Sequence, residues 1–295
     1  MEVTYTLTSE ITGYTKVLGI IANPIKHSLS PMMHNTVCQK LGLDYVYVAF
    51  DVKEEHFEEA FKGLKALGIH GMNVSMPYKT KVIPYLDSIT LQSKLCGAVN
   101  TIINKDGKYI GDITDGPGFM QGLYDKGWDP KGKKMTLFGA GGAALAIIVQ
   151  AVMDGVKEIV VYKRKNSTYH EIVDKIHDIN KELQSTITLK PLEDLEALKK
   201  DLQESYIVVN ATSVGMGSLA GKSCIPDVSY FPKGIKVADI IYNPHETKLI
   251  KQAKQAGLEY MNGERMVLFQ GALSFEQWTN SKMPISHMKK VLKII

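Results

Sequence analysis

One short stretch decides the fold: residues 134–144 read Lys-Met-Thr-Leu-Phe-Gly-Ala-Gly-Gly-Ala-Ala. Gly139, Gly141 and Ala144 satisfy the pattern GxGxx(G/A), with a predicted strand before it and the apolar run 145–149 after it. The first glycine permits a tight turn, and the second lets the backbone approach a pyrophosphate, whose charge the N–H groups of the next helix attract. The stretch therefore predicts dinucleotide binding; the alternative is a tight turn that holds no ligand.

Strands and helices alternate on both sides of this stretch, which predicts an α/β protein with largely parallel sheets. Downstream, strands are predicted at 135–138, 159–162, 186–189, 207–210 and 237–241, with helices at 142–153 and 170–183. Upstream, strands are predicted at 17–21, 45–50 and 71–75, with helices at 31–41 and 54–67. The chain is also expected to be helical from about Met266 onward.

The length of 295 residues suits two domains. We predict an N-terminal α/β substrate domain over 1–114, joined by C-terminal helices at 268–295, and a Rossmann-type dinucleotide-binding domain over 115–267. The turn-rich stretch 127–132 resembles an interdomain connection. Substrate is expected in a cleft between the two domains.

Composition excludes several classes of protein. The hydrophobic fraction is 44%, the net charge is +4, and no nucleic-acid-binding motif or run of eighteen apolar residues is present. The three cysteines, Cys38, Cys96 and Cys224, form no CxxC pair, so a disulfide framework or clustered zinc site is not indicated, and no other metal-ligand set is found. We expect a cytoplasmic protein that binds neither nucleic acid, membrane nor metal.

Polar side chains gather where the predicted strands of the first domain end, within 23–31, 71–79 and 97–101. Each has a local alternative: Ser30, before Pro31, could cap a helix, Lys79 could be a solvated lysine, and Asn100 could be a turn residue. Together they offer the hydroxyls, amides and lysine expected of a site for a small hydroxylated acid.

In combination these stretches resemble the shikimate dehydrogenase family, including its quinate/shikimate branch, over almost the whole chain. The similar segments are the pair Ser28 and Ser30, then 73–79, 97–101, 111–116, 210–216, 239–244, and Gly263 with 270–272. The resemblance implies reversible NAD(P)-dependent reduction of 3-dehydroshikimate to shikimate, on the route to chorismate and the aromatic amino acids.

The resemblance also implies roles for single residues. Lys79 would be the acid/base, working with Asp115, and Tyr242 would line the substrate pocket. Ser28 and Ser30 would bind the substrate carboxylate, and its hydroxyls would be bound by Ser75, Asn100, Asp115 and Gln270. The cofactor would lie against Ile240 and Gly263 at its nicotinamide, and its pyrophosphate against Gly139, Ala140, Gly141, Gly142 and Ala143.

Cofactor choice depends on the loop after the second strand of the dinucleotide fold, where no acidic residue stands ready to bind a ribose hydroxyl. Lys163 and Arg164 suit a 2′-phosphate, which favours NADP, whereas Asn166 could still bond the ribose of NAD. The loop lacks the NRTxxR pattern of strict NADP enzymes, Ser75 replaces the family's usual threonine, and Ile113 replaces an asparagine.

Three other functions remain open alongside the first. Quinate, alone or together with shikimate, is the nearest alternative substrate. A methylenetetrahydrofolate dehydrogenase would share the two-domain plan but not the set formed by Ser28, Ser30, Lys79 and Asp115. A non-catalytic dinucleotide-sensing regulator would be expected to lose Lys79 and Asp115. The resemblance is compatible with a homodimer, and the residues alone leave the oligomeric state open.

Overall fold

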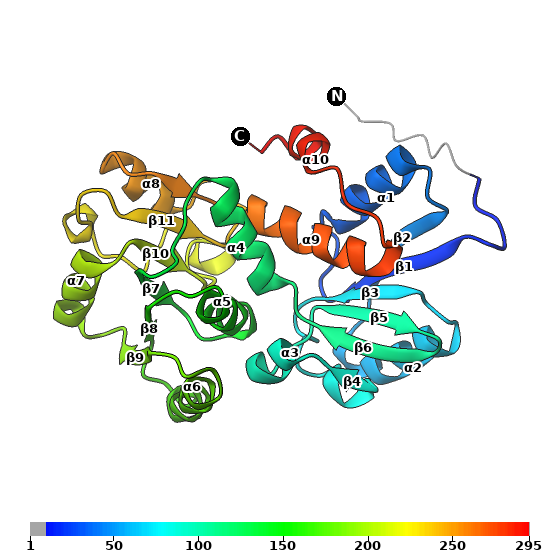
Figure 1. Cartoon of the computed structure of the whole chain (residues 1–295), viewed down its shortest axis with the longest axis horizontal. Helices are drawn as coiled ribbons and strands as arrows, with labels where there is room; N and C mark the ends of the chain where they lie inside the picture. Colours follow the sequence, from blue (N-terminus) through cyan, green and yellow to red (C-terminus); the bar gives the residue numbers. More distant parts are fainter. Residues whose placement is uncertain (1–9, 295) are drawn as a thin grey trace. The chain divides into compact units, whose positions relative to one another are not determined.

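The computed structural model describes residues 10–294, which divide into two compact units (Figure 1). Unit 1 contains the described residues up to Thr114 together with those from Gly271 onward, and unit 2 runs from Asp115 to Gln270. The second boundary falls inside helix α9 (Glu264–Thr279). The prediction of an α/β fold with two domains is confirmed; their assignment to substrate and cofactor stays a prediction.

Unit 1 is built on a six-stranded sheet in the order β2-β1-β3-β5-β6-β4. Its strands are β1 (Lys16–Ala22), β2 (Tyr45–Asp51), β3 (Gly71–Val74), β4 (Ser88–Ile89), β5 (Thr101–Lys105) and β6 (Lys108–Asp112). Its helices are α1 (Ser30–Leu41), α2 (Phe57–Ala66), α3 (Leu91–Cys96) and α10 (Ile285–Leu292), with short 3₁₀ turns at Glu54–His56 and Ile83–Tyr85.

Helices cover both faces of this sheet. Successive side chains of a strand point to opposite faces, so β1 contributes apolar side chains to both. Phe57 and Phe61 of α2 pack with Ile21 of β1 on one face. On the other face Leu18 and Ile20 of the same strand pack with Trp278 of α9 and with Tyr47 of β2. β1 and β3 pair in parallel, so their carboxyl ends lie at one edge of the sheet.

Unit 2 has a six-stranded parallel sheet in the order β12-β11-β10-β7-β8-β9. Read from β9, this is the order 3-2-1-4-5-6 of a dinucleotide-binding fold. The strands are β7 (Lys134–Phe138), β8 (Glu158–Lys163), β9 (Ile187–Pro191), β10 (Ile207–Asn210), β11 (Lys236–Asp239) and β12 (Tyr260–Met261). The Rossmann-type fold predicted from residues 134–144 is confirmed.

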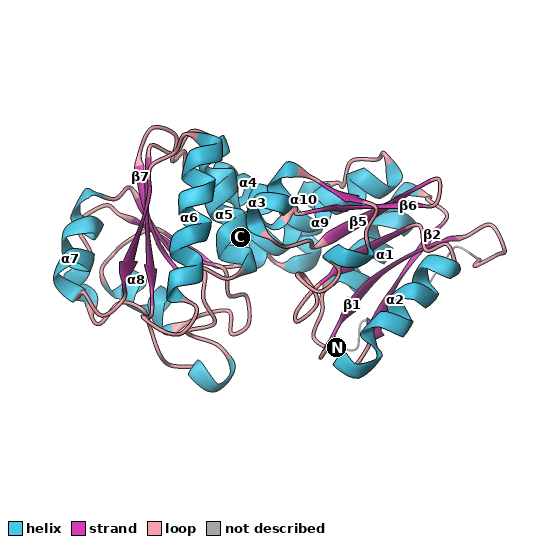
Figure 2. Ribbon diagram, turned by 90° about the horizontal axis from the view of Figure 1, so that it is seen from below, coloured by secondary structure: helices cyan, strands magenta, loops and turns pink. Residues whose placement is uncertain are grey.

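The remaining helices of unit 2 are α4 (Asp115–Asp125), α5 (Gly142–Met153), α6 (Tyr169–Leu183), α7 (Leu195–Glu204) and α8 (Lys248–Gln255), with 3₁₀ turns at Gly217–Leu219 and Val228–Tyr230. Leu198 of α7 and Leu249 of α8 pack with Phe138 and Val208 on one face of the sheet. Figure 2 shows α5 and α6 on the other face. The unit is therefore a three-layer sandwich.

The sheet of unit 1 is mixed: β1 pairs parallel with β2 and β3, and β4 with β6, whereas the β3–β5 and β5–β6 pairs are antiparallel. The sheets are largely parallel as expected, but the hairpin of β5 and β6 was not predicted. Its turn is the Asp106-Gly107 pair, both with positive φ, and Asp-Gly is a hairpin signal that the sequence contains. One expectation was wrong, because the turn-rich stretch 127–132 lies inside unit 2 and does not connect the two units.

Candidate functional site

Five of the predicted site residues lie at one edge of the sheet in unit 1. Ser28 and Ser30 follow β1, Ser75 and Lys79 follow β3, and Asn100 directly precedes β5. Because β5 runs antiparallel to β3, its first residues stand at the edge where β1 and β3 end. The sheet topology alone thus brings three serines, one asparagine and one lysine to the same edge.

Backbone hydrogen bonds lock the three segments to one another. The N–H of Asn23 donates to the carbonyl of Met76 over 3.1 Å, which joins the segment before α1 to the turn after β3. The N–H of Val99 donates to the carbonyl of Lys79 over 2.8 Å, and that of Val74 to the carbonyl of Asn100 over 2.8 Å. The backbones that carry Lys79 and Asn100 are therefore direct neighbours.

Ser30 is not the helix cap that its position before Pro31 allowed. It is the first residue of α1, the residue before the helix is Leu29, and no side chain caps this end. The N–H of Ser30 donates to Oγ of Ser28 over 3.2 Å, which brings the two serines together. The Ser30 side chain is buried and its hydroxyl is not used for capping.

Asn100 belongs to a buried set of neutral polar side chains, which we call the neutral cluster: Asn73, Asn100, Thr101, Thr114 and Ser274. Oδ1 of Asn100 accepts from the N–H of Thr114 at 2.8 Å and from Oγ1 of Thr101 at 3.0 Å. Oγ1 of Thr101 lies 2.7 Å from Oγ of Ser274, to which Asn73 also donates. The Asn100 amide is therefore fixed by several hydrogen bonds to neutral groups of the cluster.

Tyr47 connects this cluster to Ser30. Its hydroxyl donates to Oδ1 of Asn73 over 2.7 Å. Burial raises the pKa of Tyr47, and a side-chain hydrogen bond with Ser30 opposes that shift. The ring stacks on His34 with centroids 4.4 Å apart, and Asn35 bonds both the N–H and the carbonyl of Tyr47 at 2.8 Å. The sequence analysis assigned Tyr47 no role in binding the carboxylate or the hydroxyls of the substrate.

His34 lies in the core of unit 1. Its ring is fully buried, and burial lowers its pKa to about 3, so it is neutral over the physiological range. Its neighbours are aromatic rings: Tyr47, Phe275 and Trp278. We assign His34 a packing role against Tyr47.

In unit 2, the glycine-rich loop has the geometry that a diphosphate needs. Gly139 has φ +108°, and Gly141 directly precedes α5 in an extended conformation. A Cβ at Gly141 would meet no other heavy atom within 4 Å, and α5 begins without a side-chain cap and without an acidic residue in its first turn. Open space in front of uncapped N–H groups fits a dinucleotide pyrophosphate. Ala140, Gly142 and Ala143 complete this loop at the start of α5.

Asp115 and Gln270 lie on two helices of unit 2 that pack very closely. Asp115 begins α4, and Gln270 lies on α9. A Cβ on Gly118 of α4 would come within 2.5 Å of the backbone nitrogen of Gln270, so only glycine allows this approach. Asp115 is buried, and Gln270 is held by a bond from Nε2 to the carbonyl of Val267.

Ile240, Tyr242 and Gly263 come together after β11. The N–H of Gly263 donates to the carbonyl of Ile241 over 2.9 Å, and a Cβ on Gly263 would lie 2.0 Å from the carbonyl oxygen of Ile240. Burial raises the pKa of Tyr242, which is half-buried in the same segment. The structure thus joins Ile240 and Gly263, predicted to contact the nicotinamide, into one continuous surface.

The basic loop after β8 is internally bonded. Nζ of Lys163 donates to Oδ1 of Asn166 and, over 2.9 Å, to Oγ1 of Thr168. Arg164 is exposed, and its charge acts against the burial that raises the pKa of Cys224 to about 11. Lys163 therefore braces its own loop, whereas Arg164 is exposed.

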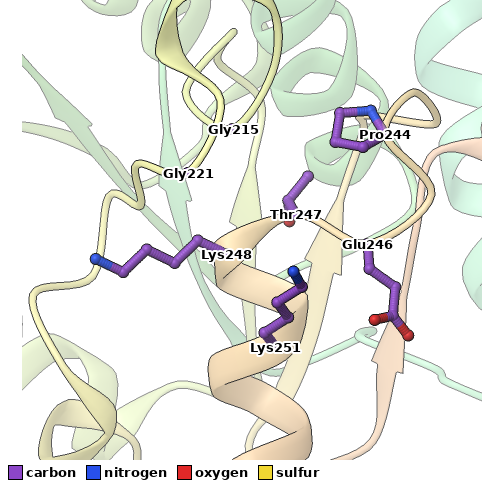
Figure 3. Close-up of a pocket in the computed structure, with 7 residues that line it drawn as sticks. All are labelled: Gly215, Gly221, Pro244, Glu246, Thr247, Lys248 and Lys251. Carbon is purple, nitrogen blue, oxygen red and sulfur yellow. The ribbon is translucent and has the colours of Figure 1, made fainter.

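A pocket lies at the start of α8 in unit 2 (Figure 3). It is lined by Gly215, Gly221, Pro244, Glu246, Thr247, Lys248 and Lys251. None of the predicted site residues lines it. Over residues 10–294, no helix is long and apolar enough to cross a membrane. The same part of the chain contains no group of three metal-binding side chains.

The sequence missed the residues that support the site. Tyr47 and Ser274 read as ordinary members of an apolar strand and an apolar helix, and Thr114 was quoted only as part of a motif. Their hydroxyls become meaningful once β5 and α9 bring them to Asn100. A buried hydroxyl needs a hydrogen-bond partner. A hydroxyl residue within a predicted apolar strand or helix was therefore the one signal in the sequence that could have indicated Tyr47 and Ser274.

Family models match the chain in two places. A model described as the shikimate dehydrogenase substrate binding domain matches residues 20–102. A model described as the shikimate 5′-dehydrogenase C-terminal domain matches residues 263–293. A protein of Listeria monocytogenes serotype 4b named shikimate dehydrogenase (NADP(+)) is 44% identical over 286 residues, which cover 97% of this chain and 98% of the relative.

Solved structures agree with these matches. The crystal structure of shikimate 5-dehydrogenase from Listeria monocytogenes in complex with shikimate and NAD has a TM-score of 0.92 and 44% identity, covering 97% of this chain and 99% of that one. Quinate dehydrogenase from Corynebacterium glutamicum in complex with NAD has a TM-score of 0.84 and 28% identity, covering 95% and 99%. The similarity extends over essentially the full length in both cases.

Proposed function

The chain belongs to the shikimate dehydrogenase family, and on that premise we propose that it catalyses the reversible NAD(P)-dependent reduction of 3-dehydroshikimate to shikimate. One observation carries the proposal beyond the family. Ser28, Ser30, Lys79 and Asn100 occupy a single edge of the unit 1 sheet and are tied together by backbone hydrogen bonds. In this proposal unit 1 binds the substrate and unit 2 the cofactor.

Substrate is held by hydroxyls and amides. Ser28 and Ser30, adjacent through the N–H to Oγ bond, are suited to a carboxylate, which accepts hydrogen bonds from hydroxyls. Ser75 and Asn100 would bind ring hydroxyls, with Asn100 already oriented by the neutral cluster. Asp115, Tyr242 and Gln270 of unit 2 complete the proposed set.

Lys79 carries the proton. In the reduction, the carbonyl carbon of 3-dehydroshikimate receives a hydride while its oxygen takes a proton from the Lys79 ammonium, and the C=O double bond becomes a C–OH group. In the oxidation, Lys79 takes that hydroxyl proton back. The nicotinamide, when bound, supplies or accepts the hydride. Asp115 is proposed to bind the same hydroxyl as Lys79.

The cofactor is proposed to be NADP rather than NAD, with Arg164 as the main contact to the 2′-phosphate. Lys163, predicted to share this role, donates instead to Asn166 and Thr168 and would orient the loop. A guanidinium suits a phosphate because its N–H groups can bond two oxygens at once. The same bond uses Oδ1 of Asn166 as an acceptor, so only the NH₂ group of that amide is left for a ribose hydroxyl of NAD.

Quinate as an additional substrate is the second candidate. The similarity to the Corynebacterium quinate dehydrogenase supports it, as does Ser75, which is one methyl smaller than the usual threonine.

A cytoplasmic location completes the proposal, because all three cysteines are buried and free.

The first test crosses shikimate and quinate with NADP and NAD in initial-rate assays of cofactor reduction. We expect the highest kcat/KM with shikimate and NADP. Comparable turnover of quinate would establish the dual-substrate enzyme, and a preference for NAD would reject the role of Arg164. No turnover in any of the four combinations would reject the enzyme and favour a dinucleotide-sensing regulator.

The second test removes the proposed acid/base. Lys79→Ala should lower kcat by about 100- to 10,000-fold and leave the dissociation constant of shikimate within about threefold, since general acid–base catalysis contributes on that scale. Lys81→Ala is the matched control, because Lys81 lies two residues away and pairs with Glu54 at the surface. An unchanged kcat in Lys79→Ala would remove Lys79 from the mechanism.

A further inference from the structure

Asp239 is a buried carboxylate without a cation. It ends β11, has no exposed surface, and takes part in no ion pair recorded for residues 10–294. It accepts three hydrogen bonds from neutral donors: Nδ2 of Asn210 at 3.0 Å, the N–H of Ile241 at 3.0 Å and Oγ1 of Thr247 at 2.7 Å. Burial raises its pKa to about 6. Burying an unpaired carboxylate lowers the stability of the fold. We therefore looked for a role of Asp239 in arranging the loops whose donors it binds.

One of the donors shapes the loop after β10. Nδ2 of Asn210 donates to the carbonyl of Val214 over 3.0 Å as well as to Asp239. Oδ1 of the same amide accepts from the N–H of Thr212 at 3.1 Å and from its hydroxyl at 2.7 Å. The loop 211–215 is therefore wrapped around the Asn210 amide, and Asp239 fixes the orientation of that amide.

The other two donors hold the segment 240–247 at both of its ends. Oδ1 of Asp239 accepts from the N–H of Ile241 at the start, and Oδ2 accepts from the hydroxyl of Thr247 at the finish. Oγ1 of Thr247 also accepts from the N–H of Ile250 at 3.3 Å and so caps α8. One carboxylate thus determines the path of the segment that carries Ile240 and Tyr242.

Gly263 depends on the same anchor. Its N–H donates to the carbonyl of Ile241, and its Cα lies so close to the carbonyl of Ile240 that no side chain fits there. A shift of the backbone at Ile240 and Ile241 would displace this contact. Every residue of unit 2 for which a nicotinamide contact is expected is therefore tied to Asp239 directly or through one neighbour.

We propose that Asp239 is a positioning residue: its carboxylate holds the loops 211–215 and 240–247 in the arrangement that receives the nicotinamide end of the cofactor. The inference rests on the proposed function for the identity of the cofactor. It concerns only contacts within unit 2 and assigns Asp239 no contact with cofactor or substrate. Substitution of Asp239 should therefore weaken binding of the nicotinamide half of the cofactor and leave binding of the adenosine half unchanged.

The test compares two ligands that share the adenosine half. Binding of NADPH and of 2′,5′-ADP, which lacks the nicotinamide, is measured by calorimetry for wild type and Asp239→Asn. The variant keeps the size of the side chain but removes its charge: the amide oxygen can still accept from Asn210 and Ile241, whereas an NH₂ group now faces the Thr247 hydroxyl in place of the oxygen to which it donates. We expect NADPH to bind about tenfold more weakly and 2′,5′-ADP to bind within about twofold of wild type, a difference worth about 1.4 kcal/mol.

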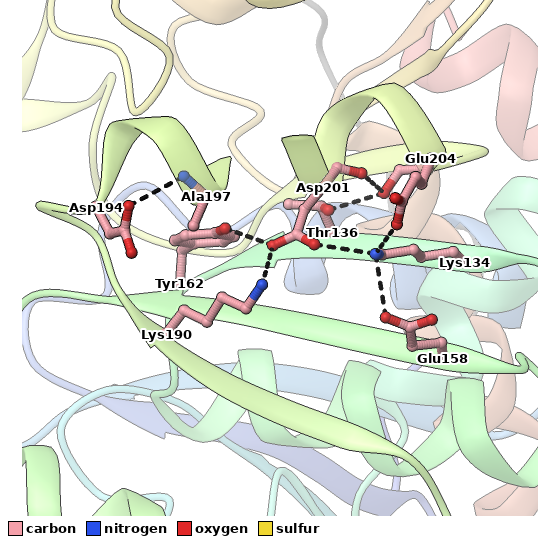
Figure 4. Close-up of polar contacts among 10 residues, drawn as sticks. Lys134, Thr136, Glu158, Tyr162, Lys190, Asp194, Ala197, Asp201 and Glu204 are labelled. Carbon is pink, nitrogen blue, oxygen red and sulfur yellow. Dashed lines mark hydrogen bonds and ion pairs between the residues drawn. The ribbon is translucent and has the colours of Figure 1, made fainter. Parts of the chain in front are cut away.

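Asp201→Asn is the matched control, because Asp201 is an equally buried aspartate of unit 2 with charged partners and no proposed ligand contact (Figure 4). A merely structural role for Asp239 predicts that both ligands weaken in proportion, or that Asp201→Asn shows the same split. Either outcome overturns the proposal, and so does NADPH binding at wild-type strength in Asp239→Asn.

If Asp239→Asn does not fold, a second pair of variants tests whether the bonds of Asp239 position these loops. Thr247→Val removes the hydroxyl that donates to Asp239, whereas Thr247→Ser keeps it. We expect Thr247→Val to raise the KM for NADP about threefold with the KM for shikimate unchanged, and Thr247→Ser to restore the wild-type value. Equal KM values for NADP in the two variants contradict the proposal. Failure of the proposed function is recognised separately, since wild type would then not oxidise shikimate.

Discussion

Two polar clusters of similar size, each around a buried side chain, differ in the charge of their members. The neutral cluster of unit 1 contains amides and hydroxyls alone and includes Asn100, a proposed substrate ligand. The charged cluster of unit 2 is centred on Asp201, whose carboxylate accepts from Lys134 at 3.0 Å, Lys190 at 2.7 Å and the Tyr162 hydroxyl at 2.5 Å (Figure 4). Lys134 also pairs with Glu204 and Glu158.

The two clusters differ in their partners. Ion pairs of Lys134 with Glu158 and Glu204, and bonds from Tyr162 and Lys190, converge around the Asp201 carboxylate, for which no ligand contact is proposed. In the neutral cluster, amides and hydroxyls orient Asn100, for which we propose a substrate-binding role. We therefore expect the charged cluster to serve stability and the neutral cluster to serve recognition as well.

The largest expected effect on stability comes from breaking the charged cluster. Asp201→Asn leaves Lys190 without its carboxylate partner and Lys134 with one fewer, and it should lower the free energy of unfolding by about 3 kcal/mol. kcat/KM should remain within about twofold of wild type. Urea denaturation and initial rates measure the two quantities. Lys62→Ala, which breaks an exposed pair with Glu58, should leave the free energy of unfolding close to the wild-type value. A loss of activity in Asp201→Asn at temperatures where it is folded would refute the separation of roles.

Breaking the neutral cluster should have the reverse consequence. Asn100→Ala removes the acceptor of the Thr114 N–H and a proposed substrate ligand together. We expect kcat/KM for shikimate to fall about 100-fold, whereas the free energy of unfolding falls by about 1–3 kcal/mol, the usual cost of leaving a buried group unbonded. The KM for NADP should not change. If activity fell only in proportion to the folded fraction, Asn100 would be structural alone.

The contrast between the clusters also shows where sequence reasoning succeeds. Gly139 and Gly141 were identified because their neighbours in the chain already define a strand, a turn and a helix. Lys79 and Asn100 were identified through short segments that resemble a family. Tyr47, Ser274 and Asp239 were not, because their partners lie far along the chain and only the fold brings them together. The antiparallel hairpin of β5 and β6 was missed despite its Asp-Gly turn.

Within unit 2, the buried aspartates Asp201 and Asp239 should respond to pH in opposite directions. Burial raises the pKa of Asp239 to about 6, so its contribution to stability is present below its unfolded pKa of about 3.9 and is lost as pH rises through 6. Burial also disfavours the charge of Asp201, but hydrogen bonds from Lys190, Tyr162 and Lys134 outweigh it and lower the pKa. That contribution is present above the unfolded pKa and is lost as pH falls through the folded one.

Unfolding measured across this range tests both signs. Between pH 7 and pH 5, wild type should gain about 1 kcal/mol relative to Asp239→Asn, since a shift of one pKa unit corresponds to about 1.4 kcal/mol. Over the same interval the difference between wild type and Asp201→Asn should stay constant, and it should shrink below about pH 3.8. Parallel pH profiles for the two variants would show that the environments of Asp201 and Asp239 do not differ as described.

The smallest expected effect tests whether Tyr47 transmits order from the neutral cluster to Ser30. Tyr47→Phe keeps the ring stacked on His34 and removes only the hydroxyl that bonds Asn73. Stability should fall by about 1 kcal/mol, the net value of one hydrogen bond. If Ser30 relies on the same hydroxyl, the KM for shikimate should rise about fivefold with kcat nearly unchanged, and Ser30→Ala should mask the effect in the double variant. Additive effects of the two substitutions would mean that Ser30 is oriented by α1 alone, and the neutral cluster would then support Asn100 without reaching the carboxylate-binding serines.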